Sequence, residues 1–316
     1  MKCGFQKKVC TSKSPTFFSR KPLAEIIAGH LNMTDFNNIQ SQILLQNNQP
    51  IDDFLGLSSN EVHHLIYDTL GANSPIQFQS EIDDRTLDQV PLFLVAEAYL
   101  KIINRDKSLK LTPLGALPKK VFVEVYEKKY LLDEHIENGL IKLWKEDDWI
   151  AIKSARLSLE LAGLVKKLNG KLTLTKKAEK FFETKNRTEL FKQFFHAFTD
   201  KFNWCYNDGY PEHPIGQLGW AFTAILLDKY GDTLLKSEFY AEKYLKAFPK
   251  FITFFKPEYT TAEEQYLRCY AVRTFERFFL WFGIVKVDNP QTILKKDLEK
   301  YVRTDLLRKV FKFDKH

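Results

Sequence analysis

The chain has 316 residues, of which 44% are hydrophobic and 14% aromatic, and this composition excludes a globally disordered protein. Its formal net charge is +7, and the basic surplus lies in two blocks: residues 101–185 hold 19 Lys and Arg against 12 Asp and Glu, and residues 286–316 hold 9 against 5. Such blocks fit nucleic acid or another polyanion, although a solvated lysine-rich surface is the simpler interpretation.

Residues 1–20 show little periodicity and are expected to form a loose tail. Apolar spacing predicts a helix from residue 22 to residue 31, and the Gln/Asn-rich segment 37–49 is a second helical candidate. Ser58 and Glu61 form a capping box, a hydroxyl followed three residues later by a carboxylate, which predicts the start of a short helix.

After a polar linker at residues 71–84, the strongest helix of the first half is expected at residues 88–104. Pro91 is tolerable there because it lies in the first turn. The helix is apolar almost all round, so we expect it to be central. Further helices are predicted at residues 188–204, 216–230, 237–247 and 261–282.

A helix followed by two short strands is clearest at residues 161–175. Asn169 and Gly170 predict a two-residue hairpin turn, because both tolerate positive φ. Gly163 can end the preceding helix in the left-handed conformation. A helix that leads into Gly-Leu-Val and a hairpin is typical of a winged helix.

Two further copies of this pattern are indicated. Residues 109–115 resemble the returning strand of the clearest copy. Residues 281–287 resemble residues 161–167, and residues 301–306 resemble the returning strand again. The spacing is irregular, so the copies do not form a solenoid array.

The copies predict a mostly α fold with small β-hairpins, in which tandem winged-helix-like units pack with additional aromatic-rich helices. The expected segments are a loose tail at 1–20, an N-terminal helical domain with the first unit at 21–130, a central unit at 131–186, and a C-terminal helical domain with a degenerate unit at 187–316.

In a DNA-binding interpretation, the helix at residues 148–161 would enter the major groove and the hairpin lysines would lie near phosphates. Its polar face holds one Arg and no Asn or Gln, so weak or nonspecific binding is expected. Alternatively, the unit serves only for packing or protein docking. The candidate DNA-binding residues are Lys153, Ser154, Arg156, Lys166, Lys167, Lys171, Lys176 and Lys177.

The segment with the most unusual composition is residues 198–214, where acidic, aromatic and histidine side chains flank a turn. These side chains could hold a small polar ligand or perform acid–base chemistry. The alternative is a structural junction, because Asp, Asn, Gly and Pro are ordinary turn formers. The candidate pocket residues are Asp200, Asn203, Trp204, Tyr206, Asp208, Tyr210, Glu212 and His213.

The cysteines, Cys3, Cys10, Cys205 and Cys269, form neither a CxxC pair nor a disulfide-framework spacing. We therefore expect reduced thiols. With no signal-peptide pattern and no apolar run of about 18 residues, the sequence predicts a cytoplasmic protein with no membrane partner. We expect no cofactor and no metal, because a structural zinc site needs four ligands and the N-terminal pair supplies two.

Residues 110–118, 163–175, 202–204 and 208–210 together resemble a group of uncharacterised bacterial proteins with winged-helix-like repeats, some of which carry SEC-C motifs. The resemblance covers most of the chain from about Leu55 onward. The N-terminal cysteines depart from the SEC-C motif, because they lack its leading Cys-x-Cys and its terminal pair. The resemblance implies no activity, since the group has no function to carry over.

These observations favour a non-catalytic intracellular adaptor or regulator whose protein partner and oligomeric state the sequence does not specify. The alternative is a winged-helix DNA-binding protein with weak, phosphate-dominated binding, so nucleic acid stays open as a partner. An enzyme or small-ligand binder using residues 200–213 is the third hypothesis. No GxxxxGK[ST], GxGxxG, GxSxG or HExxH motif is present.

Overall fold

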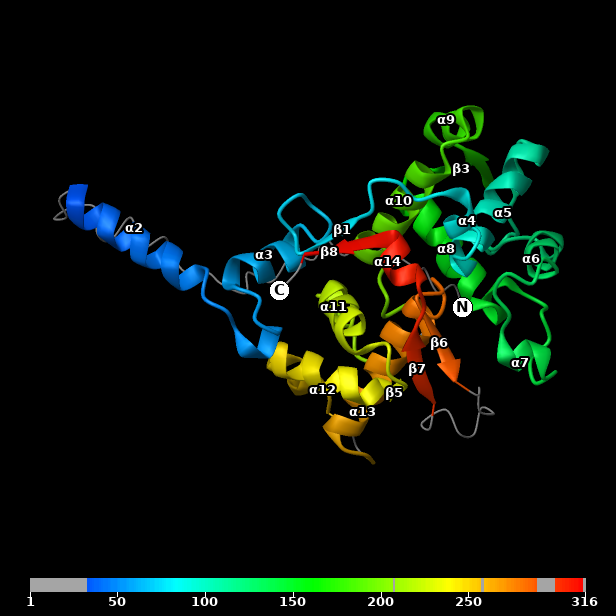
Figure 1. The fold of residues 1–316 in the computed structure, drawn as a ribbon. Coiled ribbons are helices and arrows are strands. Elements are labelled where there is room, and N and C mark those ends of the chain that lie inside the picture. The colour runs from blue at the N-terminus through cyan, green and yellow to red at the C-terminus, as the bar shows by residue number, and fades with distance from the viewer. Residues whose placement is uncertain (1–32, 207, 257–258, 289–298, 315–316) are drawn as a thin grey trace, which may run out of the picture. The chain divides into compact units, whose positions relative to one another are not determined.

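The computed structural model describes residues 33–206, 208–256, 259–288 and 299–314, and this part of the chain is mostly helical with small antiparallel sheets (Figure 1). The chain divides into two compact units, residues 1–49 and residues 50–316. In the first unit the structure describes α2 (Met33–Asn47), which confirms a helix in the Gln/Asn-rich segment. The expected tail at 1–20 and the expected helix at 22–31 lie outside the described residues.

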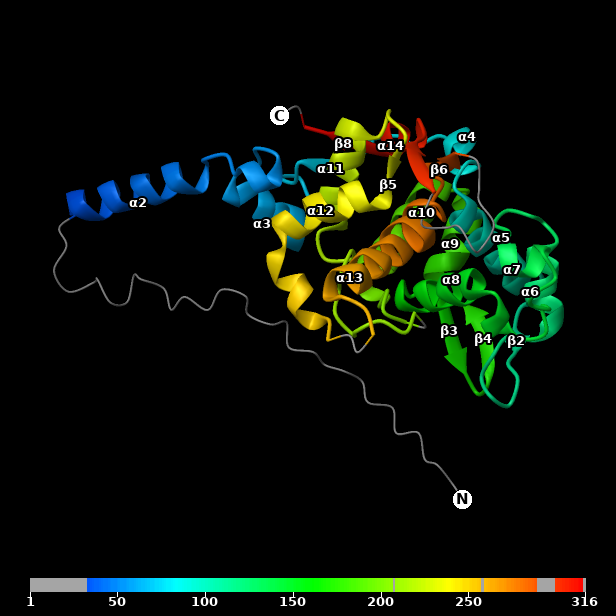
Figure 2. The same cartoon turned by 90° about the horizontal axis from the view of Figure 1, so that it is seen from below.

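The second unit contains a first module at residues 91–184. Its strands form one antiparallel sheet in the order β2-β4-β3, and Figure 2 shows them beside one another. Asn169 and Gly170 have φ of 50° and 71°, which confirms the predicted hairpin turn. The elements are α5 (Pro91–Asp106), β2 (Leu109–Lys110), α6 (Lys119–Tyr126), α7 (Glu134–Glu137), η2 (Glu146–Asp148), α8 (Ile150–Leu161), β3 (Val165–Leu168), β4 (Lys171–Leu174) and α9 (Lys176–Thr184).

A second module at residues 220–310 repeats this arrangement. Its sheet has the order β5-β7-β6, so in both modules the last strand in the chain lies in the middle. The elements are α11 (Trp220–Tyr230), β5 (Leu235–Lys236), α12 (Ser237–Ala247), η4 (Pro249–Phe254), α13 (Ala262–Tyr270), the π-helical η5 (Ala271–Phe279), β6 (Val285–Asp288), β7 (Lys300–Arg303) and α14 (Leu306–Val310).

The two modules also share the bonds that close each hairpin onto its preceding helix. Gly163 and Gly283 end these helices with φ of 69° and 70°. The Thr175 hydroxyl donates to the Gly163 carbonyl at 2.8 Å, and the Thr304 hydroxyl donates to the Gly283 carbonyl at 2.7 Å. We call each of these Thr–Gly bonds a clasp. The repeat seen in the sequence is therefore matched by equivalent backbone geometry at the base of each hairpin.

The prediction that residues 109–115 and residues 161–175 belong to separate copies is wrong. Leu109 lies opposite Leu172 in one sheet, so both segments belong to the first module. The two strands look alike because neighbours in a sheet need the same alternation of apolar and polar residues. The boundary expected between residues 130 and 131 consequently falls inside this module.

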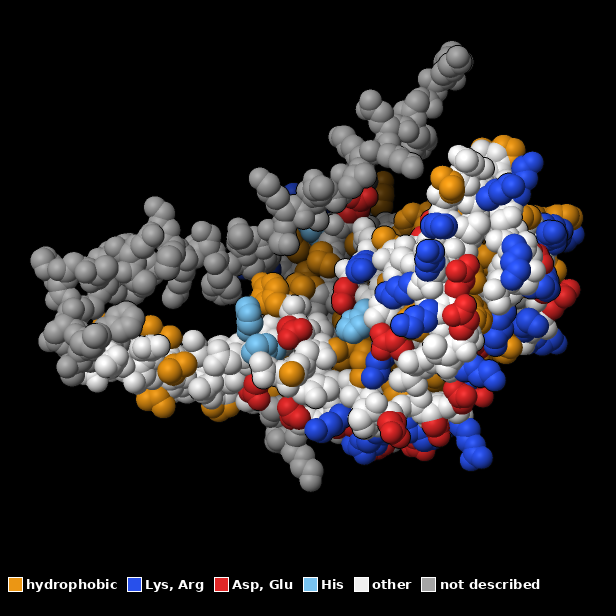
Figure 3. Space-filling view, turned by 90° about the horizontal axis from the view of Figure 1, so that it is seen from above, with side chains coloured by type: hydrophobic (Ala, Val, Ile, Leu, Met, Phe, Trp, Pro, Cys, Tyr) orange, Lys and Arg blue, Asp and Glu red, His pale blue; other side chains and the backbone are white. Residues whose placement is uncertain are grey.

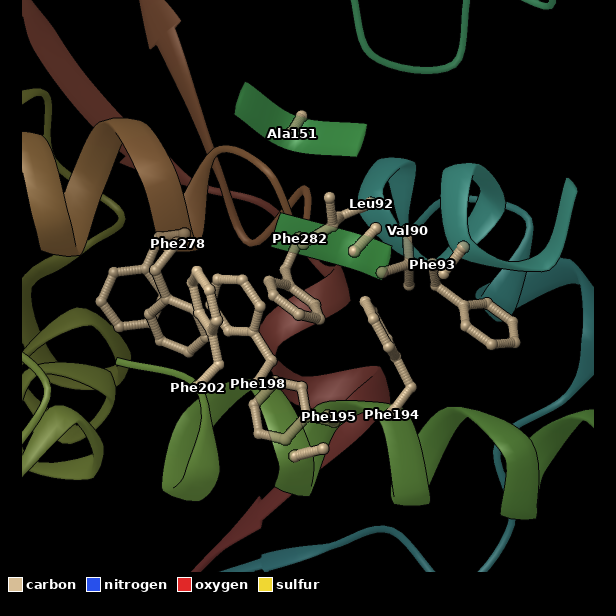
Figure 4. Close-up of a cluster of buried hydrophobic side chains, with 14 of the residues drawn as sticks. Val90, Leu92, Phe93, Ala151, Phe194, Phe195, Phe198, Phe202, Phe278 and Phe282 are labelled. Atoms are coloured by element: carbon tan, nitrogen blue, oxygen red, sulfur yellow. The ribbon is translucent and has the colours of Figure 1, made fainter. Parts of the chain in front are cut away.

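A central aromatic cluster packs around the helix that joins the two modules, α10 (Arg187–His196) with its π-helical continuation η3 (Ala197–Lys201). Ring centroids of Phe195 and Phe282 lie 5.0 Å apart, and those of Phe198 and Phe282 lie 5.1 Å apart (Figure 4). The ring centroids of Phe93, on α5, and Phe194 lie 6.4 Å apart. Because α8 also packs on η3, the joining helix covers surfaces of both modules.

The remaining described elements surround these modules. Ser58 and Glu61 make the predicted capping box at the start of α3. β1 lies inside the expected polar linker and pairs with β8, with Ile76 opposite Phe313. These elements are η1 (Asp52–Phe54), α3 (Ser59–Tyr67), β1 (Ile76–Phe78), α4 (Asp84–Leu87) and β8 (Phe311–Phe313).

Candidate nucleic-acid interface

The helix expected to enter a DNA groove, α8, is packed inside the protein. Ser154 is 2% exposed and Arg156 is 7% exposed. Lys153 is more accessible, but it forms an ion pair with Asp147. The structure thus corrects the prediction for Ser154 and Arg156: with both side chains buried, they have no access to base edges in a major groove.

Arg156 holds the first module together. Its Nε donates to Glu146 Oε1 at 2.5 Å, and its Nη1 donates to Glu160 Oε1 at 2.7 Å. Burial opposes the charged form, but the hydrogen bonds and negative charges of Glu146 and Glu160 together outweigh this effect and raise the pKa of Arg156. Glu146 also accepts the Leu117 backbone N–H at 2.8 Å, which fixes the loop after β2.

Three lysines share the outer face of the β2-β4-β3 sheet. Lys110 lies directly opposite Lys171, and Lys166 lies opposite Thr173. Residues that are directly opposite, or two apart on one strand, project from the same face. Lys110, Lys166 and Lys171 therefore form one surface, which we call the wing lysine face. All three are exposed, and none makes an ion pair within the described part of the chain.

The other predicted lysines of this region are exposed but lie apart from this face. Lys167 is opposite Leu172, on the inner face, and its Nζ lies 3.1 Å from the point where a Cβ on Gly115 would stand. Lys176 and Lys177 lie in the first turn of α9, where Lys177 donates to Gln193 Oε1 at 2.7 Å. Figure 3 shows Lys and Arg side chains gathered over this end of the molecule.

Lys110 belongs to this face but is not among the residues predicted from the sequence. The sequence does indicate a strand here, because Leu-Lys-Leu at residues 109–111 has the alternation of a strand with one polar face. Only the pairing of β2 with β4 shows that Lys110 adds to the charge of Lys171.

The loop at residues 202–219 is organised around one buried arginine. Arg273 forms an ion pair with Asp208, and both side chains are 0% exposed. The same guanidinium donates to the His213 carbonyl at 2.7 Å and to the Pro211 carbonyl at 3.0 Å. The Asp208 carboxylate is therefore engaged by Arg273, and the Arg273 bonds hold the loop in place. This is the role expected of a structural junction.

Of the other predicted pocket residues, Trp204 and Tyr206 line a small recess beside Arg273, and the Tyr210 backbone N–H donates to Asp208 Oδ1 at 2.9 Å. His213 stacks on Phe254 with ring centroids 3.6 Å apart, and Glu212 is exposed. The Trp204 indole N–H donates to the Phe198 carbonyl at 2.9 Å. The remaining members, Asp200, Asn203, Tyr206 and Tyr210, are exposed or half-buried. The arrangement gives no base and acid facing a common cleft, so it counts against the acid–base hypothesis.

One recess in the surface of the described residues holds about 10 Å³, room for one water molecule, and lies between Ser154, Trp204 and Arg273. Another holds about 290 Å³ over α5 and α6. Among its wall charges, Arg105 pairs with Glu124 at 2.6 Å and Lys101 pairs with Glu97 at 2.9 Å, whereas Lys128 lines the recess beside them. Most of the charge in this wall is therefore already engaged within the protein.

No protein-family model matches the chain, and no curated protein or solved structure is significantly similar to it. The described helices are each too short or too polar to cross a membrane. The described residues contain no group of three or more His, Cys, Asp or Glu side chains that could hold a metal ion. The wing lysine face is therefore the surface feature that bears most directly on function.

Proposed function

We propose that the protein is a non-catalytic, DNA-associated adaptor that holds the phosphate backbone of duplex DNA through the wing lysine face. The order of elements in each module, a helix, a strand, further helices and a hairpin, supports a winged-helix-like assignment of both modules. In the first module the hairpin is the part that stays open to a partner.

The cross-strand pair of Lys110 and Lys171 carries this proposal. Like charges directly opposite in a sheet destabilise it, and here no carboxylate in the described part of the chain offsets them. A phosphate between the two ammonium groups would remove that repulsion. With Lys166 beside them, the face can neutralise about three phosphates.

Binding of this kind is insensitive to base sequence. Lysines act on phosphates as point charges, and phosphate contacts carry no sequence information directly. The buried α8 presents neither Ser154 nor Arg156 for base readout. We therefore expect similar affinities for duplexes of unrelated sequence and a steep dependence on salt.

The first prediction concerns this salt dependence. Lys110→Gln, Lys166→Gln and Lys171→Gln together should flatten the slope of log K against log salt by about 2 to 3, because each neutralised phosphate contributes roughly 0.9. A titration of a fluorescent random duplex at several salt concentrations measures the slope. The matched control, Lys120→Gln, Lys128→Gln and Lys142→Gln, removes the same charge from exposed positions outside the sheet.

The control variant should keep a slope close to that of the unmodified protein, and it should keep the same thermal midpoint. The thermal midpoint of the variant of the wing lysine face should not fall, because this variant removes like charges that lie opposite each other. Equal losses in the two variants would mean that net charge, not the wing lysine face, drives binding. No binding to duplex DNA at low salt would rule out the proposed function itself.

A protein-docking role in the same adaptor is favoured by the insert between α6 and α8. Leu140 is 67% exposed and Trp144 is 64% exposed, and both lie within 13 residues of Leu132, which is 44% exposed. Exposed apolar side chains gathered in one segment often mark a protein interface. A photo-crosslinking residue at position 140 should give a discrete adduct in cells, whereas one at the exposed Lys107 should not.

A further inference from the structure

The second module carries the same cross-strand lysine pair as the first. Leu235 lies opposite Tyr301, and Lys236 lies opposite Lys300. This register reproduces that of β2 and β4, in which an apolar pair is followed by a lysine pair. Since opposed lysines cost stability in either sheet, their occurrence at equivalent positions in both modules calls for a common cause.

The third lysine is also repeated. Lys286 follows Val285 in β6 just as Lys166 follows Val165 in β3, at the same distance from the clasp glycine. Lys286 lies opposite Val302, two residues along β7 from Lys300, so Lys236, Lys286 and Lys300 share the outer face of their sheet. Lys286 and Lys300 are exposed and make no ion pair within the described residues.

Two carboxylates distinguish this second face from the first. Asp288 lies opposite Lys300, where the first module has Leu168 opposite Lys171. Glu238 lies 3.9 Å from the Lys236 ammonium. An exposed pair at that distance is worth less than about 1 kcal/mol, so both carboxylates weaken the attraction of the face for an anion without abolishing it.

We infer that the outer face of the β5-β7-β6 sheet is a second, weaker site for the DNA backbone, so that one molecule holds two duplex segments at once. This inference rests on the proposed function of the first face. The β2-β4-β3 and β5-β7-β6 sheets lie apart in both cartoon views (Figures 1 and 2). Two separated cationic faces within one compact unit suit the bridging of two duplexes better than a single contact.

A bridging assay tests the inference. One duplex is fixed on beads, the protein is added, and recovery of a second, fluorescent duplex is measured beside the amount of protein retained. Replacement of Lys236, Lys286 and Lys300 by Gln should leave retention within about twofold and reduce recovery of the second duplex at least tenfold. The matched control replaces the exposed Lys246, Lys309 and Lys312 by Gln and should bridge normally.

A variant that gains function guards against a trivial folding defect. Asp288→Leu gives the second face the residue that the first face has at the equivalent position, and removes a carboxylate opposite Lys300. It should increase recovery of the second duplex severalfold while retention on the first duplex changes little. A loss of bridging in this variant would contradict the electrostatic basis of the second site.

The outcomes separate the inference from the proposed function. If the unmodified protein is retained on DNA but never recovers a second duplex, the second site does not exist and the first site stands. The same conclusion follows if the variant at Lys236, Lys286 and Lys300 bridges normally. If the protein is not retained on DNA at all, both proposals fail together.

Discussion

Tyr240 and Tyr266 are both buried in the second module, but their hydroxyl groups differ in partners. Tyr266 donates to the Ala241 carbonyl at 2.7 Å. The Tyr240 hydroxyl is buried without a hydrogen-bond partner in the described part of the chain. A buried polar atom left in this state costs about 1–3 kcal/mol, whereas a satisfied one stabilises the fold by about 1 kcal/mol.

Tyr240→Phe should therefore raise the free energy of unfolding by about 1 kcal/mol, and Tyr266→Phe should lower it by about 1 kcal/mol. Urea denaturation of the two variants beside the unmodified protein measures the difference. Each change removes one oxygen from a fully buried ring, so each variant is the control for the other. Equal destabilisation by both would show that the Tyr240 hydroxyl is satisfied, for example by a buried water.

Asp208 shows what sequence reasoning can and cannot foresee about a single residue. The mixture of acidic, aromatic and turn-forming residues around it marked an unusual loop, and a structural junction was among its interpretations. The partner that decides the matter, Arg273, lies on η5, far along the chain. The sequence around Asp208 does not identify Arg273 as its partner, because a buried ion pair produces no periodic pattern in the sequence.

At the scale of elements, signals that act over a few residues were predicted correctly. The capping box at Ser58 and the positive φ at Asn169 depend on neighbours within three or four positions. The pairing of β1 with β8 was missed because its partners come from opposite ends of the second unit, with Ile76 opposite Phe313. A pairing between strands so far apart in the chain leaves no signal in the sequence pattern of either strand.

The two clasp glycines offer a test of element geometry. Both have positive φ, but their surroundings differ. A Cβ on Gly163 would meet nothing within 4 Å, whereas a Cβ on Gly283 would stand 2.7 Å from the Gln89 carbonyl oxygen and 3.1 Å from Pro91. The backbone strain of a left-handed alanine is common to both positions, and the clash exists at one of them.

We expect Gly163→Ala to lower the free energy of unfolding by about 1 kcal/mol, the cost of a left-handed residue with a side chain. Gly283→Ala should cost at least about twice as much, because the Gln89 backbone has to move as well. Thermal denaturation of both variants gives the comparison. Similar costs at the two positions would mean that the helix end of the second module shifts freely.

At the scale of the whole molecule, burial of ionisable groups makes the fold sensitive to alkali. Burial raises the pKa of the Cys269 thiol from 9.0 to about 12, and it raises the pKa of the Tyr266, Tyr270 and Tyr301 hydroxyls. In the unfolded chain these groups ionise at their ordinary values. The folded state therefore binds more protons at alkaline pH, and stability falls as pH rises.

The free energy of unfolding should be nearly constant from neutral pH to about pH 8 and then fall increasingly steeply. Each group contributes a slope of about 1.4 kcal/mol per pH unit once the pH is above its ordinary pKa and the group is still neutral in the fold. Urea midpoints measured between about pH 7 and about pH 11 follow the decline. In Cys269→Ala the thiol no longer contributes, so the decline above about pH 9 should be shallower. A flat profile would contradict burial of these groups.

The mostly helical architecture and the hairpin of the first module were predictable, but the number of modules and the burial of α8 were not. The predicted polar face of α8 is real in the sequence, since Ser154 and Arg156 are polar. The structure turns that face inward onto η3 and onto Glu146, which belong to other parts of the chain. Polarity alone does not reveal whether a helix faces solvent or a buried partner.

The clasps anchor two hairpins whose connections differ in length. The first hairpin closes with Asn169 and Gly170, whereas residues 289–299 connect the strands of the second, and yet the bonds at the base are the same. The same bonds thus anchor a two-residue turn in one module and a longer connection in the other. We therefore expect insertions between the strands to leave these bonds in place, so that the length and charge of the connection can change in natural or designed variants while the base of the hairpin is kept.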